Sequence, residues 1–198
     1  MDLVRVTTTL TPESVEAGYR EGIFPMADPD FPGITWHRPP MRAIIPLDGF
    51  HVSRSLARRM RTARFEITFD RDFEGVMRAC AAREPTWITE DLIEVYVALH
   101  RAGKAHSVEV RVNGQVAGGV YGVHLGAAFF AESMFHSVTD MSKVALASLV
   151  ARLRERNFQL LEVQYLTPHL AGLGAIEIPH DEYLVRLRQA LDHNHTML

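Results

Sequence analysis

The sequence contains a single cysteine, Cys80, so the chain has no intrachain disulfide. A lone thiol is typical of a protein in a reducing compartment, and we expect a cytoplasmic location with Cys80 buried as a small hydrophobic residue. No apolar run approaches the roughly 20 residues that a membrane-spanning helix needs. The first residues also lack the basic flank and apolar stretch of a signal peptide. We therefore expect a globular protein without a membrane partner.

Two further absences limit the chemistry that we expect. The ten histidines do not combine with cysteine or carboxylates at the spacing of metal ligands, so we expect neither a metal nor another cofactor. Ser133 lacks the flanking glycines of a nucleophile elbow, which disfavours an acyl-enzyme on this serine.

The formal net charge is −3 at pH 7, so the chain has no general excess of positive charge. One segment differs, because residues 54–64 contain five arginines and no acid. Two interpretations are open: a solvated helix face, or a stripe that binds phosphate groups. The arginines of this segment are Arg54, Arg58, Arg59, Arg61 and Arg64, and Arg38 and Arg42 precede them.

Apolar periodicity and turn signals predict the order of helices and strands. Thr11 followed by Pro12 favours a helix start, and Gly22 favours its end. Residues 24–41 contain five prolines and are expected to form a structured loop or small lobe. The pair Asn113-Gly114 predicts a tight hairpin. Further helices are expected after Ser53, Asp72 and Thr89 and over 142–155, from 167 and over 181–191; strands are expected over 65–69, 108–112, 115–118, 126–132 and 160–164.

This order indicates an α+β fold with a mixed sheet between helices on both faces. The same order is found in acetyltransferase-like folds of the GNAT type, which bind the CoA pyrophosphate at a glycine-rich helix start. Here the helix from Ser142 follows residues 135–141, which contain no glycine, so a pyrophosphate site is not favoured.

Several short strings occur together along most of the chain. They are Tyr19-Arg-Glu-Gly-Ile-Phe-Pro25, Thr86-Trp-Ile88, Leu99-His-Arg-Ala-Gly-Lys-Ala-His-Ser-Val-Glu109, Gly118-Gly-Val-Tyr-Gly-Val123, Glu132-Ser-Met-Phe135, Ser142-Lys143, and Gln164 with His169-Leu170 and Leu173-Gly-Ala175. In this order and spacing they resemble the leucyl/phenylalanyl-tRNA–protein transferases. The resemblance implies a GNAT-like catalytic domain over 43–198 behind a small, abridged N-terminal domain over 1–42.

The activity implied by this resemblance is an aminoacyl transfer of the N-degron pathway, which marks proteins for degradation. Leu, Phe or Met would move from aminoacyl-tRNA to proteins that begin with Arg or Lys. The family's proposed relay corresponds to Glu162 and Gln164, which a strand would place on one face. Here Glu162 replaces the family's aspartate. We expect Gln164 to position the amine and Glu162 to stabilise its ammonium form; the alternative is that Glu162 only neutralises a buried arginine.

The resemblance also implies binding residues around this pair. Val120, Phe129 and Met134 match positions of the aminoacyl pocket, and Glu132 matches an acid that we expect to bind the substrate ammonium or the basic side chain. Each of these is also compatible with an ordinary core or ion-pair role.

Unpaired bases are usually held by stacking on aromatic rings. The resemblance assigns this task to Trp87, with Met26, Trp36 and His37 at the family's other aromatic positions, although Trp87 could equally be a core residue. Arg42, Arg54, Arg58 and Arg61 are expected to contact tRNA phosphates.

Two other functions remain open from the sequence alone. The first is an acyl-CoA-dependent acyltransferase on the same fold. The second is a binding module that holds aminoacyl-tRNA or an N-degron with little catalysis; the replacement at Glu162, Met26 and the short N-terminal segment favour it.

Overall fold

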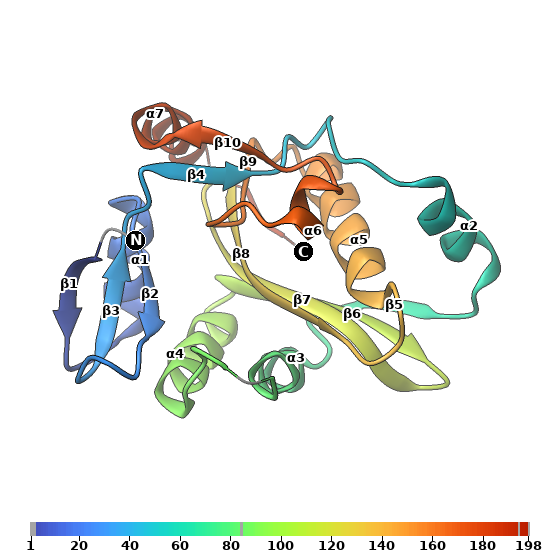
Figure 1. Cartoon of the computed structure of the whole chain (residues 1–198), viewed down its shortest axis with the longest axis horizontal. Coiled ribbons are helices and arrows are strands. Elements are labelled where there is room, and N and C mark those ends of the chain that lie inside the picture. The colour runs from blue at the N-terminus through green and yellow to red at the C-terminus, as the bar shows by residue number, and fades with distance from the viewer. Residues whose placement is uncertain (1–2, 84, 194, 198) are drawn as a thin grey trace.

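Two β-sheets organise the chain in this computed structural model, which describes residues 3–83, 85–193 and 195–197 (Figure 1). The smaller sheet is antiparallel, with the order β1-β3-β2, and consists of Leu3–Thr7 (β1), Phe24–Ala27 (β2) and Ile34–His37 (β3). Helix α1, Pro12–Arg20, packs on β2 and also contacts the helices of the larger part. We call β1, α1, β2 and β3 the N-terminal lobe.

The larger sheet has seven strands in the order β10-β4-β9-β8-β7-β6-β5. Its strands are Met41–Ile44 (β4), Glu66–Phe69 (β5), Ala105–Val112 (β6), Gln115–Leu125 (β7), Ala128–His136 (β8), Leu160–Glu162 (β9) and Ile176–Pro179 (β10). Only β8 and β9 pair in parallel among the paired strands of this sheet in the described residues. Parallel neighbours need a long crossover, which helix α5, Met141–Glu155, supplies.

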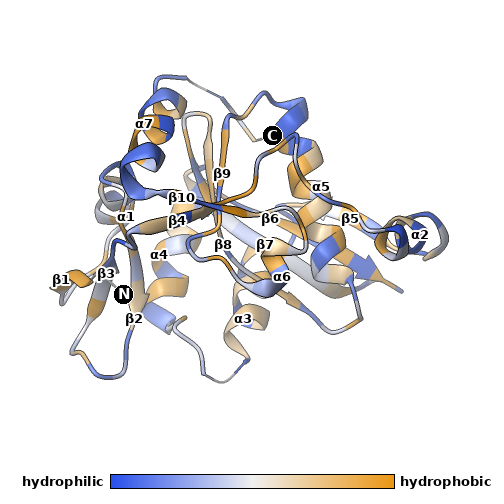
Figure 2. Cartoon of the chain, turned by 45° about the horizontal axis from the view of Figure 1, so that its top comes forward, coloured by the Kyte–Doolittle hydropathy of each residue, from blue (hydrophilic) through white to orange (hydrophobic). Residues whose placement is uncertain are grey.

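Helices cover both faces of this sheet. Helix α5 packs on one face, where apolar side chains of β6, β7, β8 and β9 form one core cluster. On the other face lie α3, Phe73–Ala81, α4, Glu90–Arg101, and α7, His180–Leu191, around the second cluster. Two shorter helices are α2, Arg54–Thr62, and α6, Pro168–Ala171. Figure 2 shows α5 largely hydrophobic where it crosses the sheet, whereas α2 and α7 carry hydrophilic stretches.

The α+β prediction, with a mixed sheet between helices behind a small N-terminal part, is confirmed. The predicted helix over 12–20 is present, with Gly22 at φ 77°, and the Asn113-Gly114 hairpin is present with both residues at positive φ. The predicted boundary after residue 42 falls inside β4 and stays a prediction. Among the described residues, no helix combines the length and apolarity that a bilayer crossing requires.

The proline-rich segment forms part of a small lobe, one of the two alternatives expected for it, but its strands were not predicted. Residues 24–41 form two strands of the three-stranded sheet and the start of β4. Pro25 is tolerated because β2 is an edge strand, and the other prolines lie between strands, which leaves Ile34–His37 free to pair on both sides. The predicted strand over 160–164 is also too long. It ends at Glu162, and Gln164 has a left-handed φ of 57°.

Candidate functional site

A cavity of about 560 Å³ opens where β8 and β9 separate. The two strands pair only from Ala128 to Phe130 on β8, whereas β8 continues to His136 beside β7 alone. The chain leaves β9 after Glu162, and its departure exposes the second half of β8. The wall is completed by β2, the segment before α4 and helix α6. Figure 1 shows α6 near the middle of the molecule and β2 in the small sheet to its left. Its size suits a small organic ligand.

Glu132 on β8 is the centre of a hydrogen-bond network at the cavity wall. The hydroxyl of Tyr19 donates to Oε1 of Glu132, and Gln164 Nε2 donates to the same oxygen at 3.1 Å. The hydroxyls of Tyr19 and Tyr96 are 2.7 Å apart. Three distant segments, α1, α4 and the turn after β9, therefore fix one carboxylate.

Removal from water dominates the electrostatics of Glu132. Burial raises the pKa of this carboxyl to about 8; the hydrogen bond from Tyr19 opposes the rise, and the charge of Glu162 adds to it. A carboxyl with such a pKa titrates near neutral pH, which is a common property of functional sites.

Glu162 lies behind the cavity wall. Its Oε1 accepts hydrogen bonds from Arg42 Nη2 at 2.6 Å and Nε at 3.1 Å, and both side chains are fully buried. The same oxygen accepts the backbone N–H of Gln164 at 2.8 Å. Glu162 and Gln164 do not share a strand face as predicted, because the backbone turns between them. The alternative interpretation, that Glu162 neutralises a buried arginine, describes its observed contacts.

Five of the predicted site residues surround the cavity together. Met26, Trp87, Glu132, Met134 and Gln164 all line it. A recess of about 80 Å³ adjoins it, lined by apolar side chains and by Glu132 and Gln164. The apolar members of the recess are Val120, Ala131, Met134, Leu146, Val163 and Leu170. Phe129 belongs to the same core cluster as Val120 and is 1% exposed.

Three predicted contacts need correction because the side chains are buried. Trp36 is fully buried in β3 and its indole N–H donates to Thr7 Oγ1 at 3.0 Å, so its ring is not open to a base. His37 is 3% exposed and hydrogen-bonds Thr35. Arg42 is ion-paired and buried, which excludes contact with a tRNA phosphate in this conformation. Trp36 and His37 lie in β3 of the small sheet, whereas Arg42 lies in β4 of the larger sheet. Packing around these two strands buries all three side chains.

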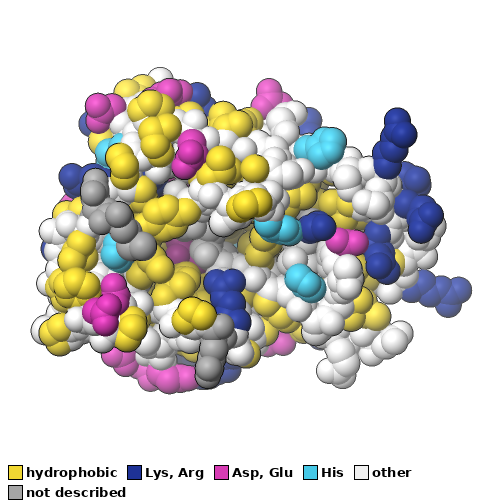
Figure 3. Space-filling model, viewed as in Figure 1, with side chains coloured by type: hydrophobic (Ala, Val, Ile, Leu, Met, Phe, Trp, Pro, Cys, Tyr) yellow, Lys and Arg dark blue, Asp and Glu magenta, His cyan; other side chains and the backbone are white. Residues whose placement is uncertain are grey.

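The remaining predicted arginines lie on the outside of α2. Arg54, Arg58 and Arg61 are exposed, and the helix contains no acidic residue. Figure 3 shows Lys and Arg side chains gathered over the part of the surface where Figure 1 places α2. Contact of these arginines with phosphates stays a prediction.

Sequence reasoning did not identify several residues of the wall. Arg83 lines the cavity and its Nη2 donates to Ser133 Oγ at 3.2 Å. His136 and His169 line the same cavity. Tyr19 was noted only within a motif string. No periodic pattern marks these residues, because they come from segments that only the tertiary fold brings together.

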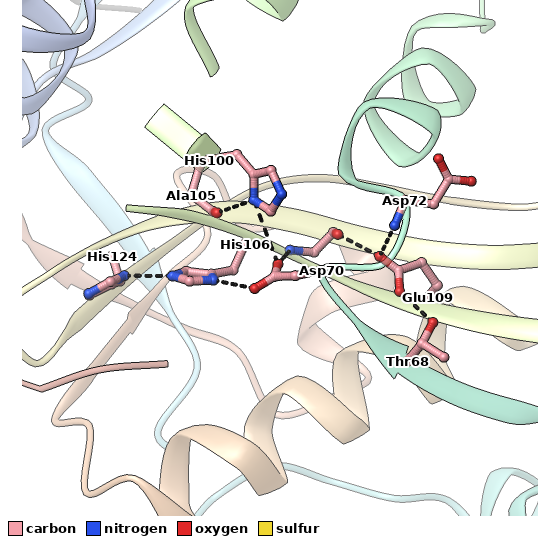
Figure 4. A network of polar contacts seen from close by, with 9 residues as sticks. Thr68, Asp70, Asp72, His100, Ala105, His106, Glu109 and His124 are labelled. Atoms are coloured by element: carbon pink, nitrogen blue, oxygen red, sulfur yellow. Dashed lines mark hydrogen bonds and ion pairs between the residues drawn. The ribbon is translucent and has the colours of Figure 1, made fainter. Parts of the chain in front are cut away.

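The string from Gly103 to Glu109 contributes a polar network outside the cavity (Figure 4). Asp70, at φ 58°, accepts hydrogen bonds from His106 Nδ1 at 2.6 Å and from the backbone of Ser107 at 2.8 Å. Glu109 accepts from Thr68 and Ser107, both at 2.5 Å. None of these residues lines the large cavity. The network anchors β5 and the start of α3 to β6, so this motif has a structural role here.

Family models match nearly the whole chain. The leucyl/phenylalanyl-tRNA protein transferase model matches residues 44–188, and the model of the N-terminal domain of this transferase matches residues 8–40.

Curated relatives named leucyl/phenylalanyl-tRNA–protein transferase agree with these matches. The relative from Ruegeria pomeroyi is 54% identical over 93% of this chain and 88% of its own length. One from Cereibacter sphaeroides is 56% identical over 92% and 86%, and one from Chlorobaculum parvum is 51% identical over 90% and 94%.

Solved structures are similar only at a low level. A ribosomal-protein-alanine N-acetyltransferase from Brucella melitensis has a TM-score of 0.41 and 17% identity, over 55% of this chain and 86% of its own. The acetyltransferase AAC(6')-Iy, in complex with a bisubstrate analogue, has a TM-score of 0.39 and 13% identity, over 68% and 93%.

Proposed function

The chain belongs to the leucyl/phenylalanyl-tRNA protein transferase family. From this premise we propose that the cavity is the active site in which an amino acid is transferred to a protein. Leu, Phe or Met would pass from aminoacyl-tRNA to the α-amine of a protein that begins with Arg or Lys. One observation carries this proposal: the cavity combines an apolar recess with the hydrogen-bonded pair Glu132 and Gln164.

The recess suits the side chain of the transferred amino acid. Val120, Leu146 and Met134 give it an apolar wall, and its volume is about 80 Å³. Such a wall discriminates by shape, since one methylene changes the binding free energy by only about 1–3 kcal/mol. The flexible thioether of Met134 is suited to side chains as different as Leu and Phe.

The terminal adenosine would lie between Met26 and Trp87. Both side chains line the large cavity and both are partly exposed, unlike Trp36 and His37. Stacking of a base on one aromatic ring contributes about 1–3 kcal/mol. The apolar thioether of Met26 contacts the other face of the base, so one tryptophan is enough to hold the adenine between two side chains.

The acceptor stem would contact α2. Arg54, Arg58 and Arg61 are exposed on one helix without acids, and such contacts bind phosphates without selecting a base sequence. This property suits an enzyme that accepts tRNAs for more than one amino acid.

The reaction is direct aminolysis of an activated ester, so positioning provides most of the acceleration. Gln164 faces the cavity and orients the reacting groups, in keeping with its predicted role. Glu162 acts through Gln164, because it holds the Gln164 backbone N–H from behind the wall. We place this reaction in the cytoplasm, where it would mark proteins for degradation.

Transfer of radiolabelled leucine tests the proposal. The protein is incubated with labelled Leu-tRNA and a peptide that begins with Arg, beside a peptide that differs only by an initial Gly. We expect label on the Arg peptide alone. If neither peptide is labelled but Leu-tRNA binds saturably, the protein is a binding module and not an enzyme. Modification by acetyl-CoA instead would indicate an acyl-CoA-dependent enzyme.

A further inference from the structure

Glu132 occupies a unique position among the described residues of the cavity wall, because it is the only carboxylate there. Glu162, the acid implied by family resemblance as the partner of Gln164, is fully buried and its Oε1 is engaged by Arg42. An amine that enters the cavity therefore meets Glu132 first, and Glu162 is screened by the wall.

The hydrogen bonds around Glu132 hold its carboxylate in a fixed orientation, as a group that transfers protons requires. The hydroxyl of Tyr19 and the amide of Gln164 both donate to Oε1, which restricts rotation of the carboxylate. Tyr19 is held in turn by Tyr96, and its ring stacks on Phe130 at 4.5 Å between centroids. A side chain locked in this way keeps a reactive oxygen in one place, which efficient proton transfer needs.

We propose that Glu132 is a catalytic residue that carries a proton from the attacking amine to the departing ribose oxygen, with Tyr19 of the N-terminal lobe as its positioning residue. This inference rests on the aminoacyl transfer proposed above and assigns the proton step within it.

The step is balanced as follows. The neutral α-amine of the acceptor forms a bond to the ester carbonyl carbon and becomes positively charged in the tetrahedral intermediate. The Glu132 carboxylate takes one proton from this nitrogen. The bond between the carbonyl carbon and the ribose oxygen breaks, and Glu132 returns the proton to that oxygen. The products are an amide and a free ribose hydroxyl, and Glu132 is again a carboxylate.

The proton affinity of Glu132 agrees with this role. Its pKa is raised to about 8 by burial, so near neutral pH this carboxyl can both accept and release a proton. The charged and titratable groups that shift the pKa of Glu132 are Tyr19 on α1, Glu162 on β9 and Arg42 on β4. Tyr96 on α4, Tyr121 on β7 and Tyr183 on α7 also face it; burial raises the pKa of each of these hydroxyls, and the charge of Glu132 raises it further.

Replacement of the carboxylate by its isosteric amide is the direct test. In Glu132→Gln we expect kcat for Leu transfer to fall about 10²-fold or more, the usual contribution of a positioned acid–base group. The KM for aminoacyl-tRNA should stay within about threefold, because the amide keeps the shape of the wall. Glu132→Asp keeps the proton-carrying group, and we expect it to retain a larger share of kcat than the Gln variant. Thermal melting checks that each variant is folded.

The pH profile separates a proton-transfer role from a structural one. With the same acceptor peptide, the acid limb of kcat should move to higher pH in Tyr19→Phe, because the lost hydrogen bond stabilises the carboxylate. Tyr121→Phe is the matched control: it removes a buried hydroxyl that has no hydrogen-bond partner among the described residues, and the limb should not move. Titration of the Glu132 carboxyl by carbon-13 NMR in Tyr19→Phe should show the same shift without catalysis.

Each outcome decides the inference. Unchanged kcat in Glu132→Gln, or an acid limb in Tyr19→Phe that coincides with the unmodified protein, overturns it while leaving aminoacyl transfer intact. Absence of transfer by the unmodified protein removes the proposed function, and the proton step with it.

Discussion

Arg42 and Glu162 form an ion pair that solvent does not reach: Nη2 of Arg42 lies 2.6 Å from Oε1 of Glu162, and both side chains are fully buried. Desolvation of two charges is costly, and only their close contact and additional hydrogen bonds offset it. Arg42 also donates to the carbonyl of Gly22 at 2.5 Å. Removal of either partner therefore leaves an uncompensated charge in the interior.

Arg42→Met should lower the free energy of unfolding by about 3–5 kcal/mol, the usual cost of an unpaired buried charge. Urea denaturation measures it. Arg186→Met is the control, because Arg186 pairs with Glu182 at 2.5 Å on the exposed side of α7. An exposed pair contributes about 0–1 kcal/mol. Equal losses in the two variants would contradict the importance that we attach to burial.

The stability of the protein should depend on pH through Glu132. Its folded pKa of about 8 lies above the ordinary value of 4.5, so the folded state binds the proton more tightly than the unfolded state. The stabilisation is complete below pH 4.5 and is lost as the pH rises through about 8. We would measure the free energy of unfolding of the unmodified protein and of Glu132→Gln at pH 5 and at pH 9. From pH 5 to pH 9 the unmodified protein should lose more stability than the variant. Equal losses would contradict the raised pKa of Glu132.

The two tryptophans should respond differently to the nucleoside. Trp87→Ala should weaken binding of aminoacyl-adenosine by about 1–3 kcal/mol, whereas Trp87→Phe should keep most of the affinity. Trp36→Phe should lower stability and leave the affinity unchanged, because the ring of Trp36 is fully buried. Titration calorimetry measures the affinities. Equal affinity in Trp87→Ala and the unmodified protein would place the base elsewhere.

The arginines of α2 should determine the salt dependence of tRNA binding. The double variant Arg58→Ala, Arg61→Ala should bind tRNA more weakly, and each lost phosphate contact should reduce the slope of log affinity against log salt by about 0.7–0.9. Arg78→Ala is the control, because Arg78 is already paired with Glu74 and Glu90. A slope that is unchanged in the double variant removes α2 from the interface.

The shape of the recess should determine the preference among amino acids. Met134→Ala would widen it beside Val120, so kcat/KM for Leu should fall about tenfold while that for the larger Phe falls less. Competition between Leu-tRNA and Phe-tRNA for one peptide measures the ratio. A ratio equal to that of the unmodified protein would show that the recess does not receive the side chain.

Local signals in the sequence predicted most helices. Caps such as Thr11 and Ser53 act through hydrogen bonds within three residues, so they are visible without the fold. Strand β1 of the N-terminal lobe was missed because it pairs with a distant segment, as Leu3 with His37 does. Strands β2 and β3 pair locally, as Ala27 with Ile34 does, but prolines lie in and beside them. Prolines at the ends of these strands also resemble loop signals.

The candidate site was predictable in its members and less so in its geometry. Met26, Trp87, Glu132 and Gln164 were selected from the family resemblance, and all four line one cavity. The sequence did not reveal that β9 ends at Glu162. A continuous strand would have placed Glu162 beside Gln164 in the cavity, whereas Glu162 is buried behind the cavity wall. A residue with positive φ that is not glycine gives no reliable signal in a sequence, since few residues adopt that conformation.

The guanidinium of Arg42 touches three parts of the chain at once. It binds Glu162 at the end of β9, the carbonyl of Gly22 just after α1, and the ring of Tyr183 on α7, whose centroid is 4.2 Å away. One cation thus links the N-terminal lobe to both the sheet and the last helix. The chain should consequently melt in one cooperative transition, and the N-terminal lobe should not loosen before the rest.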